Sequence, residues 1–187
     1  SSSYNYRDVI NQSKYPYYAS KKDKTLCVPF TAEETLLVRA EAEIIQKQYD
    51  AAVADLNTWS AAYLNTTKKT FTKDEIIAFY KALDYSTATS PTIKKQLHPA
   101  FTLDGGEDQL MLLQHLLQCR RVATAHEGLR WFDIRRYGIE VFRFVHDAKD
   151  RAKFTVAKTL SSWDEHTTFQ IPQNVRNAGM EPTPRTK

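Results

Sequence analysis

The sequence predicts an all-α protein in which a helical hairpin is followed by further helices and long irregular loops. Three observations predict this fold class. The chain has only 5 glycines in 187 residues, so few positions suit the tight turns of a many-stranded sheet. Apolar residues recur at helical spacing in two segments, 32–65 and 107–126. Two helix-start patterns of the form Thr-x-x-Glu, at Thr31 and Thr72, lie directly before apolar runs.

The first helix pair is expected at residues 32–65, with a turn at 46–50 and with Asp50 as the cap of the second helix. The apolar stripes of the two helices comprise Leu36, Leu37, Ala40, Ile44, Val53 and Leu56. The pair spans 34 residues, the period of a tetratricopeptide repeat (TPR), so we interpret it as a TPR-like hairpin. A single repeat cannot bury its own apolar faces, and we therefore expect further helices to pack against it.

The middle of the chain predicts a short helix after Thr72 and one helical turn at 93–97. The segment 104–108 reads Asp-Gly-Gly-Glu-Asp. It lacks the alternating carboxylates of a calcium loop, so we interpret Asp104 and Glu107 as the capped start of the next helix.

A long helix is expected at about 107–126, with Gly128 as its left-handed C-cap. A further helix follows, in which Arg130 and Asp133 lie three residues apart and can form an ion pair. Trp59 and Trp131 fall in helical patterns and are expected in the core.

The remainder of the chain predicts little regular structure. Residues 142–167 are charged and are expected to be irregular, and the end from Thr168 is expected to be extended and proline-rich. Trp163 has the most polar neighbours of the three tryptophans, so its ring is a candidate for exposure; packing of a loop is an equally good interpretation.

The composition limits the kinds of partner. Hydrophobic residues make up 42% of the chain and charged residues 26%, which is typical of globular proteins. The net charge is +4, and basic residues such as Lys94 and Lys95 are spread along the chain. We interpret them as a solvated surface and expect no nucleic-acid partner. No run of about 18 apolar residues and no signal-peptide pattern occurs.

No known catalytic motif occurs in the sequence, and its five histidines are scattered. His115 and His126 would share a helix face but lie about 16 Å apart, too far to bind one metal ion. We therefore expect no catalysis, no metal and no cofactor. The two cysteines, Cys27 and Cys119, form no disulfide framework, and whether they pair stays open.

The segment EGLRWFDIRRYG resembles the EG-x-R-x-x-D-x-x-R-x-G segment of the SusD/RagB family, nutrient-binding outer-membrane lipoproteins of Bacteroidetes. Earlier in the chain, the family's E-x-x-L-x-R-A-E-A and A-x-x-D-L-N runs are matched through Arg39, Glu41 and Asn57, and we expect Arg39 and Glu41 to form a charge pair on one helix face. The residues that match the later segment, all expected to be structural, are Glu127, Gly128, Arg130, Asp133, Arg136 and Gly138.

The resemblance implies that residues 1–187 are the C-terminal part of a SusD-like protein whose N-terminal part and lipoprotein signal are not in this chain. It implies a lipid anchor on an N-terminal cysteine outside the chain and a place on the cell-surface side of the outer membrane. It also implies non-catalytic capture of an oligosaccharide or another nutrient, and delivery to a SusC-like TonB-dependent transporter. The alternative is a TPR-type protein-interaction scaffold that binds no sugar.

Exposed aromatic residues are the candidates for sugar contact, because a ring face stacks on a pyranose and polar neighbours bond its hydroxyl groups. Tyr15, Tyr17 and Tyr18 lie among polar residues near the start of the chain, and Trp163 is the fourth candidate. Packing of the tyrosines onto helices that are not in the chain is the alternative interpretation.

Overall fold

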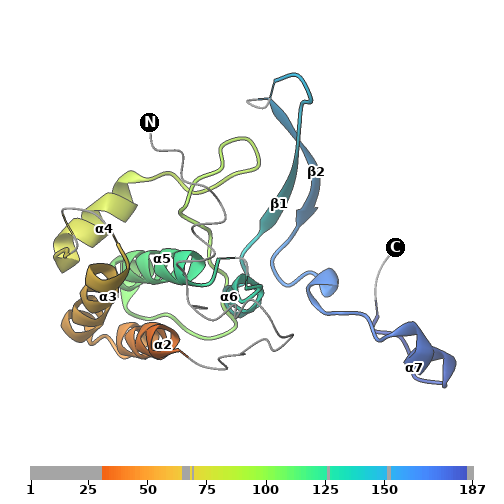
Figure 1. Ribbon diagram of the computed structural model, residues 1–187, viewed down its shortest axis with the longest axis horizontal. Coiled ribbons are helices and arrows are strands. Elements are labelled where there is room, and N and C mark those ends of the chain that lie inside the picture. Colours follow the sequence, from red (N-terminus) through yellow and green to blue (C-terminus); the bar gives the residue numbers. More distant parts are fainter. Residues whose placement is uncertain (1–30, 65–67, 69, 126, 151–152, 185–187) are drawn as a thin grey trace, which may run out of the picture. The chain divides into compact units, whose positions relative to one another are not determined.

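The computed structural model describes residues 31–64, 68, 70–125, 127–150 and 153–184. The described residues form six α-helices, one short 3-10 helix and a two-stranded sheet, so the prediction of a largely helical fold is confirmed (Figure 1). The helices are α2 (Ala32–Ile45), α3 (Tyr49–Tyr63), α4 (Lys73–Ala82), α5 (Gly106–Ala123), α6 (Arg130–Tyr137) and α7 (Gln173–Asn177). The strands are β1 (Val141–His146) and β2 (Phe154–Leu160), and η1 (Glu165–Thr167) is the 3-10 helix.

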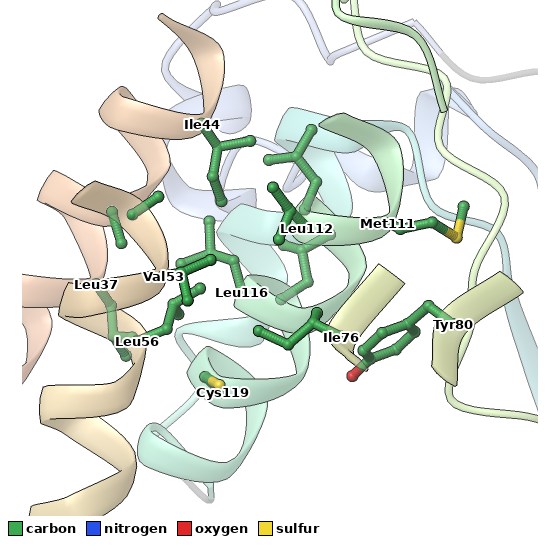
Figure 2. Close-up of a cluster of buried hydrophobic side chains, with 14 of the residues drawn as sticks. Leu37, Ile44, Val53, Leu56, Ile76, Tyr80, Met111, Leu112, Leu116 and Cys119 are labelled. Atoms are coloured by element: carbon green, nitrogen blue, oxygen red, sulfur yellow. The ribbon is translucent and has the colours of Figure 1, made fainter. Parts of the chain in front are cut away.

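Helix α5 is the centre of the hydrophobic core. Apolar side chains of α2, α3 and α4 are directed at it in Figure 2, where Leu112 and Leu116 lie between those of the other helices. Both leucines are fully buried. Burying a leucine side chain contributes about 1.5–3 kcal/mol relative to leaving it exposed, so α5 is the element on which the stability of the helical part depends most.

Helices α2 and α3 form where the apolar stripes predict them, although Asp50 does not cap α3. The helix begins two residues earlier than a cap at Asp50 would place it, at Tyr49, and the N-cap residue Gln48 makes no side-chain cap bond. Asp50 lies instead in the first turn, where a negative charge is favourable near the exposed backbone N–H groups.

Two buried glutamines of α5 bond to backbone groups of distant segments. The Gln109 Nε2 donates to the Ile44 carbonyl at 3.0 Å, which satisfies a group at the end of α2. Gln114 accepts from the Lys95 N–H at 2.9 Å and donates to the Lys95 carbonyl at 2.6 Å. The helical turn predicted at 93–97 is therefore wrong: this segment has no helix, and its backbone bonds to the Gln114 side chain and to the Ser86 N–H rather than within itself.

The start of α4 is fixed by two local devices. The predicted capping box is confirmed, since Thr72 accepts from the Glu75 N–H and the Glu75 side chain accepts from the Thr72 N–H. The Asn57 side chain both donates to the Phe71 carbonyl and accepts from the Phe71 N–H, each at 2.8 Å. Asn57 thus joins α3 to the segment before α4.

The segment 142–167 is not irregular as predicted, because β1 and β2 pair as an antiparallel hairpin. Phe142 and Phe144 are half-buried and alternate with the exposed Arg143 and Val145. That period-2 alternation is the ordinary sequence signal of a strand with one buried face. The prediction missed it because the charged residues of this segment were taken to indicate irregular structure.

Three further predicted boundaries differ. Helix α5 ends at Ala123 with Thr124 as its C-cap, so Gly128 is not the cap, although its φ of +78° places it in the turn before α6. Asp104 does not start α5, because Gly105 occupies the N-cap position and Asp104 bonds to the Lys47 ammonium at 2.7 Å. The end of the chain contains the short helix α7 rather than extended backbone alone.

Candidate ligand-binding site

A buried cluster of charges joins the two segments on which the family resemblance depends. The Glu41 carboxylate of α2 accepts from Arg120 of α5, from Arg136 of α6 at 2.8 Å and from the Tyr137 hydroxyl. Arg120 also donates to Asp133 at 3.1 Å. We call these five residues, with Arg130, the charge cluster. It links α2 to the consecutive helices α5 and α6, which lie far from α2 in the sequence.

Burial and pairing oppose each other within the charge cluster. Burial disfavours the Glu41 carboxylate, but the charge of Arg120 and the hydrogen bonds from Tyr137, Arg136 and Arg120 outweigh it, so the pKa of Glu41 is lowered. Burial raises the pKa of Asp133 despite the two arginines beside it. The predicted pair of Arg130 and Asp133 is confirmed at 3.5 Å. All these carboxylates are occupied by cations, which indicates a structural role rather than a binding role.

Arg39 and Glu41 do not form the helix-face pair that we expected. They are two residues apart in α2 and therefore lie on different sides of the helix. Arg39 makes a bidentate bond to Asp55 of α3, with both N–O distances at 2.6 Å, while Glu41 lies in the charge cluster. The Arg39–Asp55 pair joins the two helices of the hairpin.

Gly138, the last residue of the family segment, is the left-handed C-cap of α6, with a φ of +55°. A Cβ atom at this position would lie 2.5 Å from the His98 carbonyl oxygen and 2.9 Å from the Trp163 Nε1. Gly138 is therefore required both by its backbone conformation and by the close approach of two other segments.

Trp163 is the one predicted sugar-contact residue within the described part of the chain, and 51% of it is exposed. Its Nε1 donates to the His98 carbonyl at 2.8 Å, and its backbone has a φ of +61°. A non-glycine residue rarely adopts this conformation, so surrounding contacts must hold it. The ring is thus exposed yet held in place. Tyr15, Tyr17 and Tyr18 lie outside the described residues.

An open hollow of about 380 Å³ lies beside the segment that contains Trp163. Its lining includes Leu160 and Asp164, which flank Trp163 along the chain. The hollow offers several kinds of polar group from β1, β2 and η1, namely Arg143, Lys158, Thr159, Asp164 and His166. Such a mixture of donors and acceptors suits a ligand with many hydroxyl groups, which donate and accept at once.

Local hydrogen bonds keep Asp164 ionised. Its side chain accepts from the His166 backbone N–H and contacts the His166 Nδ1, at 2.7 and 2.8 Å. These bonds lower the pKa of Asp164 from its usual value. Asp164 is thereby a fixed acceptor at the edge of the hollow, whereas Arg143 and Lys158 are donors on the adjacent strands.

A second, apolar groove of about 510 Å³ lies among α3, α4 and α5. It is lined by Trp59, Phe79, His115 and Cys119, among others. Burial lowers the pKa of His115 to about 4 and raises that of the Cys119 thiol to about 12, so both are neutral. The Trp59 Nε1 is buried there without a hydrogen-bond partner in the described part of the chain. The groove offers almost no polar group to a hydrophilic ligand.

The placement of the tryptophans matches the predictions only in part. Trp59 is buried at 3% exposure, as predicted, and stacks on Tyr63 with ring centroids 4.9 Å apart. Trp131 is only partly buried and contacts the exposed Phe169.

Sequence analysis missed Arg143 and Lys158 as candidate site residues. They are brought together by the hairpin of β1 and β2, and the alternation of half-buried and exposed residues in β1 was the sequence signal that could have predicted it.

Comparisons with protein-family models, with curated proteins and with solved structures found no match. Among the described residues, no group of three or more histidine, cysteine, aspartate or glutamate side chains could hold a metal ion. The search of the same residues for a helix long and apolar enough to cross a membrane found none.

Proposed function

We propose that this chain is the C-terminal part of a SusD-like lipoprotein on the surface of the outer membrane. In this proposal the protein captures an oligosaccharide without chemical change and delivers it to a SusC-like TonB-dependent transporter. The lipid anchor belongs to the N-terminal part, and residues 32–65 are a TPR-like pair within the helical scaffold.

The observation that supports sugar binding is the exposed Trp163 ring, which is next in the chain to Asp164, a residue that lines a hollow with both donors and acceptors. The hydrogen bond to the His98 carbonyl uses the polar edge of the indole, so the ring is oriented before any ligand arrives. Sugars are bound by stacking on such a face combined with hydrogen bonds to hydroxyl groups. Because the ring is already fixed, little conformational entropy would be lost on binding.

The charge cluster supports the family part of the proposal. Glu41 comes from the earlier family-like segment, whereas Asp133 and Arg136 come from the later one. Arg120 lies between Glu41 and Asp133 and bonds to both. Side chains from both family-like segments thus meet in the charge cluster. This is expected if the two segments stabilise the same part of the fold.

The acid content of the hollow favours binding over hydrolysis. Most glycosidases use two carboxyl groups, one of which is kept protonated by a raised pKa. Asp164 is the single carboxylate in the described lining of the hollow, and its pKa is lowered rather than raised. It can accept a hydrogen bond from a hydroxyl group but is unsuited to act as a general acid.

A panel of oligosaccharides titrated against the protein, followed by tryptophan fluorescence and calorimetry, tests this function. We expect saturable binding to one class of glycan with no products by chromatography. Trp163→Ala should weaken that binding about tenfold, since aromatic contacts contribute about 0.5–1.5 kcal/mol beyond the area that they bury. Phe132→Ala is the matched control, because Phe132 is 68% exposed and neither it nor its neighbours in the chain line the hollow.

Absence of binding across the panel, or equal effects of the two substitutions, would contradict the proposed site. The alternative, a protein-interaction scaffold, is favoured by one observation, the apolar groove with its 53% exposed Phe79. Loss of a co-purifying protein in Phe79→Asp, with glycan binding absent throughout, is the result that would favour that scaffold.

A further inference from the structure

A third cavity, of about 470 Å³, lies between the end of α5, helix α6, strand β1 and the segment 86–95. In Figure 1, β1 follows closely after α6. Both elements contribute to the lining of the cavity, through Ile134 of α6 and through Phe142 and Phe144 of β1. The cavity lining contains three cations, Lys95, Arg121 and Arg130, and one carboxylate, Glu140. We call it the basic cavity. It is lined by different residues from the hollow near Trp163, apart from Val141.

The three cations of the basic cavity have few anionic partners. Arg121 makes no hydrogen bond or ion pair with the described residues. Arg130 has Asp133 as its partner, at 3.5 Å, while the stronger bond of Asp133 is to Arg120. Within the described part of the chain, the Lys95 Nζ donates to two neutral oxygens, the Ser86 hydroxyl at 2.8 Å and the Thr92 carbonyl at 2.6 Å. Positive charge therefore exceeds negative charge here.

The two arginines disfavour the protonated form of Lys95. Burial, followed by the charges of Arg121 and Arg130, lowers the pKa of Lys95 to about 8. The prediction that Lys94 and Lys95 belong to a solvated surface is thus wrong. Lys94 is buried with its ammonium on the Leu83 carbonyl, and Lys95 is half-buried in this cavity. An anion placed among the three cations would remove their mutual repulsion.

The remaining wall of the basic cavity is apolar. Phe142 and Phe144 contribute from β1, with ring centroids 6.3 Å apart, and Ile134 and Ile139 contribute from the α6 side. A hydrated inorganic anion would leave this wall without a contact. A ligand with one anionic end and one apolar end would instead use both parts of the cavity.

We propose that the basic cavity binds a small monocarboxylate, with its carboxylate at Arg121 and Arg130 and its apolar part against Phe142 and Phe144. The planar guanidinium fork can bind a carboxylate through two parallel hydrogen bonds, as it can a phosphate. The charge balance of the cavity favours the carboxylate. Glu140 also lines the cavity and reduces its excess of positive charge, so a ligand with a single negative charge is favoured. This site does not depend on the proposed glycan binding.

Calorimetric titration of the full 187-residue chain with benzoate tests the proposal. Benzamide, which is neutral and of the same shape, and inorganic sulfate are the comparison ligands. We expect benzoate to bind saturably and at least tenfold more tightly than either of them. Arg121→Gln should weaken benzoate binding about tenfold without loss of folding, because Arg121 makes no bond that the fold uses. Arg135→Gln, an exposed arginine of α6 outside the cavity, is the matched control.

The pH dependence provides a second readout. Benzoate affinity should fall between pH 7 and 9, since Lys95 loses its proton there, and Lys95→Met should remove most of this slope. The other charged groups that line the cavity are Arg121, Arg130 and Glu140. Sulfate binding as tight as benzoate binding, or benzoate binding that is unchanged in Arg121→Gln, would overturn the assignment, as would an absence of benzoate binding at millimolar concentration.

Discussion

Replacement of Arg120 by methionine removes the guanidinium that bonds to both carboxylates of the charge cluster. Glu41 and Asp133 have side chains only 9% and 10% exposed, so water cannot replace the lost donor. Removing one partner of a buried ion pair costs about 3–5 kcal/mol. Glu41 keeps Arg136 and Tyr137, and Asp133 keeps Arg130, so we expect a loss of unfolding free energy of about 3 kcal/mol, at the lower end of that range.

The neighbouring substitution Arg130→Ala provides the internal comparison. Sequence reasoning predicts that it leaves Asp133 without a partner. In the structure Asp133 retains Arg120 at the shorter distance of 3.1 Å, so the expected loss falls to about 1 kcal/mol. Arg135→Met serves as the surface control and should change stability by less than about 0.5 kcal/mol.

Urea denaturation followed by tryptophan fluorescence measures all three variants, and thermal melting provides a check. For a chain of this length each kcal/mol lowers Tm by about 2–4 °C, so Arg120→Met should melt roughly 6–12 °C below the parent protein. Equal losses in Arg120→Met and Arg130→Ala would refute the reasoning, since the argument depends on Arg120 bonding to two carboxylates and Arg130 to one.

Two further predictions concern pH and backbone conformation. His115 is neutral in the fold and has a pKa of about 4, below its ordinary value of 6.5, so the unfolded chain takes up a proton first as pH falls. Stability should therefore decrease by about 3 kcal/mol from pH 6.5 to 4, and His115→Phe should flatten this part of the curve in urea titrations at each pH; an unchanged slope would contradict burial as the cause. Gly138→Ala should lower the free energy of unfolding by more than about 2 kcal/mol, because the added Cβ would meet the His98 carbonyl at 2.5 Å. Gly128→Ala is its control, with a positive φ of similar size but no atom within 4 Å of the Cβ, and should cost only about 1 kcal/mol; similar losses in both would show that the close contact has no effect.

Sequence reasoning could not predict which residues of the candidate site contact partners far away in the chain. The polar neighbours of Trp163 made an exposed ring one of two equal interpretations, and the bond that holds the ring comes from His98, 65 positions away. Arg143 and Lys158 meet across a hairpin whose strands were expected to be irregular. Each of these contacts depends on how elements pack, and no local pattern records that packing.

The sequence by itself determined the features that depend on neighbouring residues. Apolar spacing located α2, α3 and α5, Thr72 and Glu75 located the start of α4, and a separation of three residues predicted the Arg130–Asp133 pair. These features follow from helix geometry over one or two turns, within which the sequence contains all the interacting groups.

Only the tertiary structure decided which charges meet and which are buried. Glu41 pairs with Arg120, 79 positions away, rather than with the nearby Arg39. Lys94 lies buried, although the composition of the chain suggested that its lysines belong to the surface. The physical reason is that the energy of a charge depends on its burial and on the groups placed around it. Both are set by the packing of helices on α5, not by the order of residues in the chain.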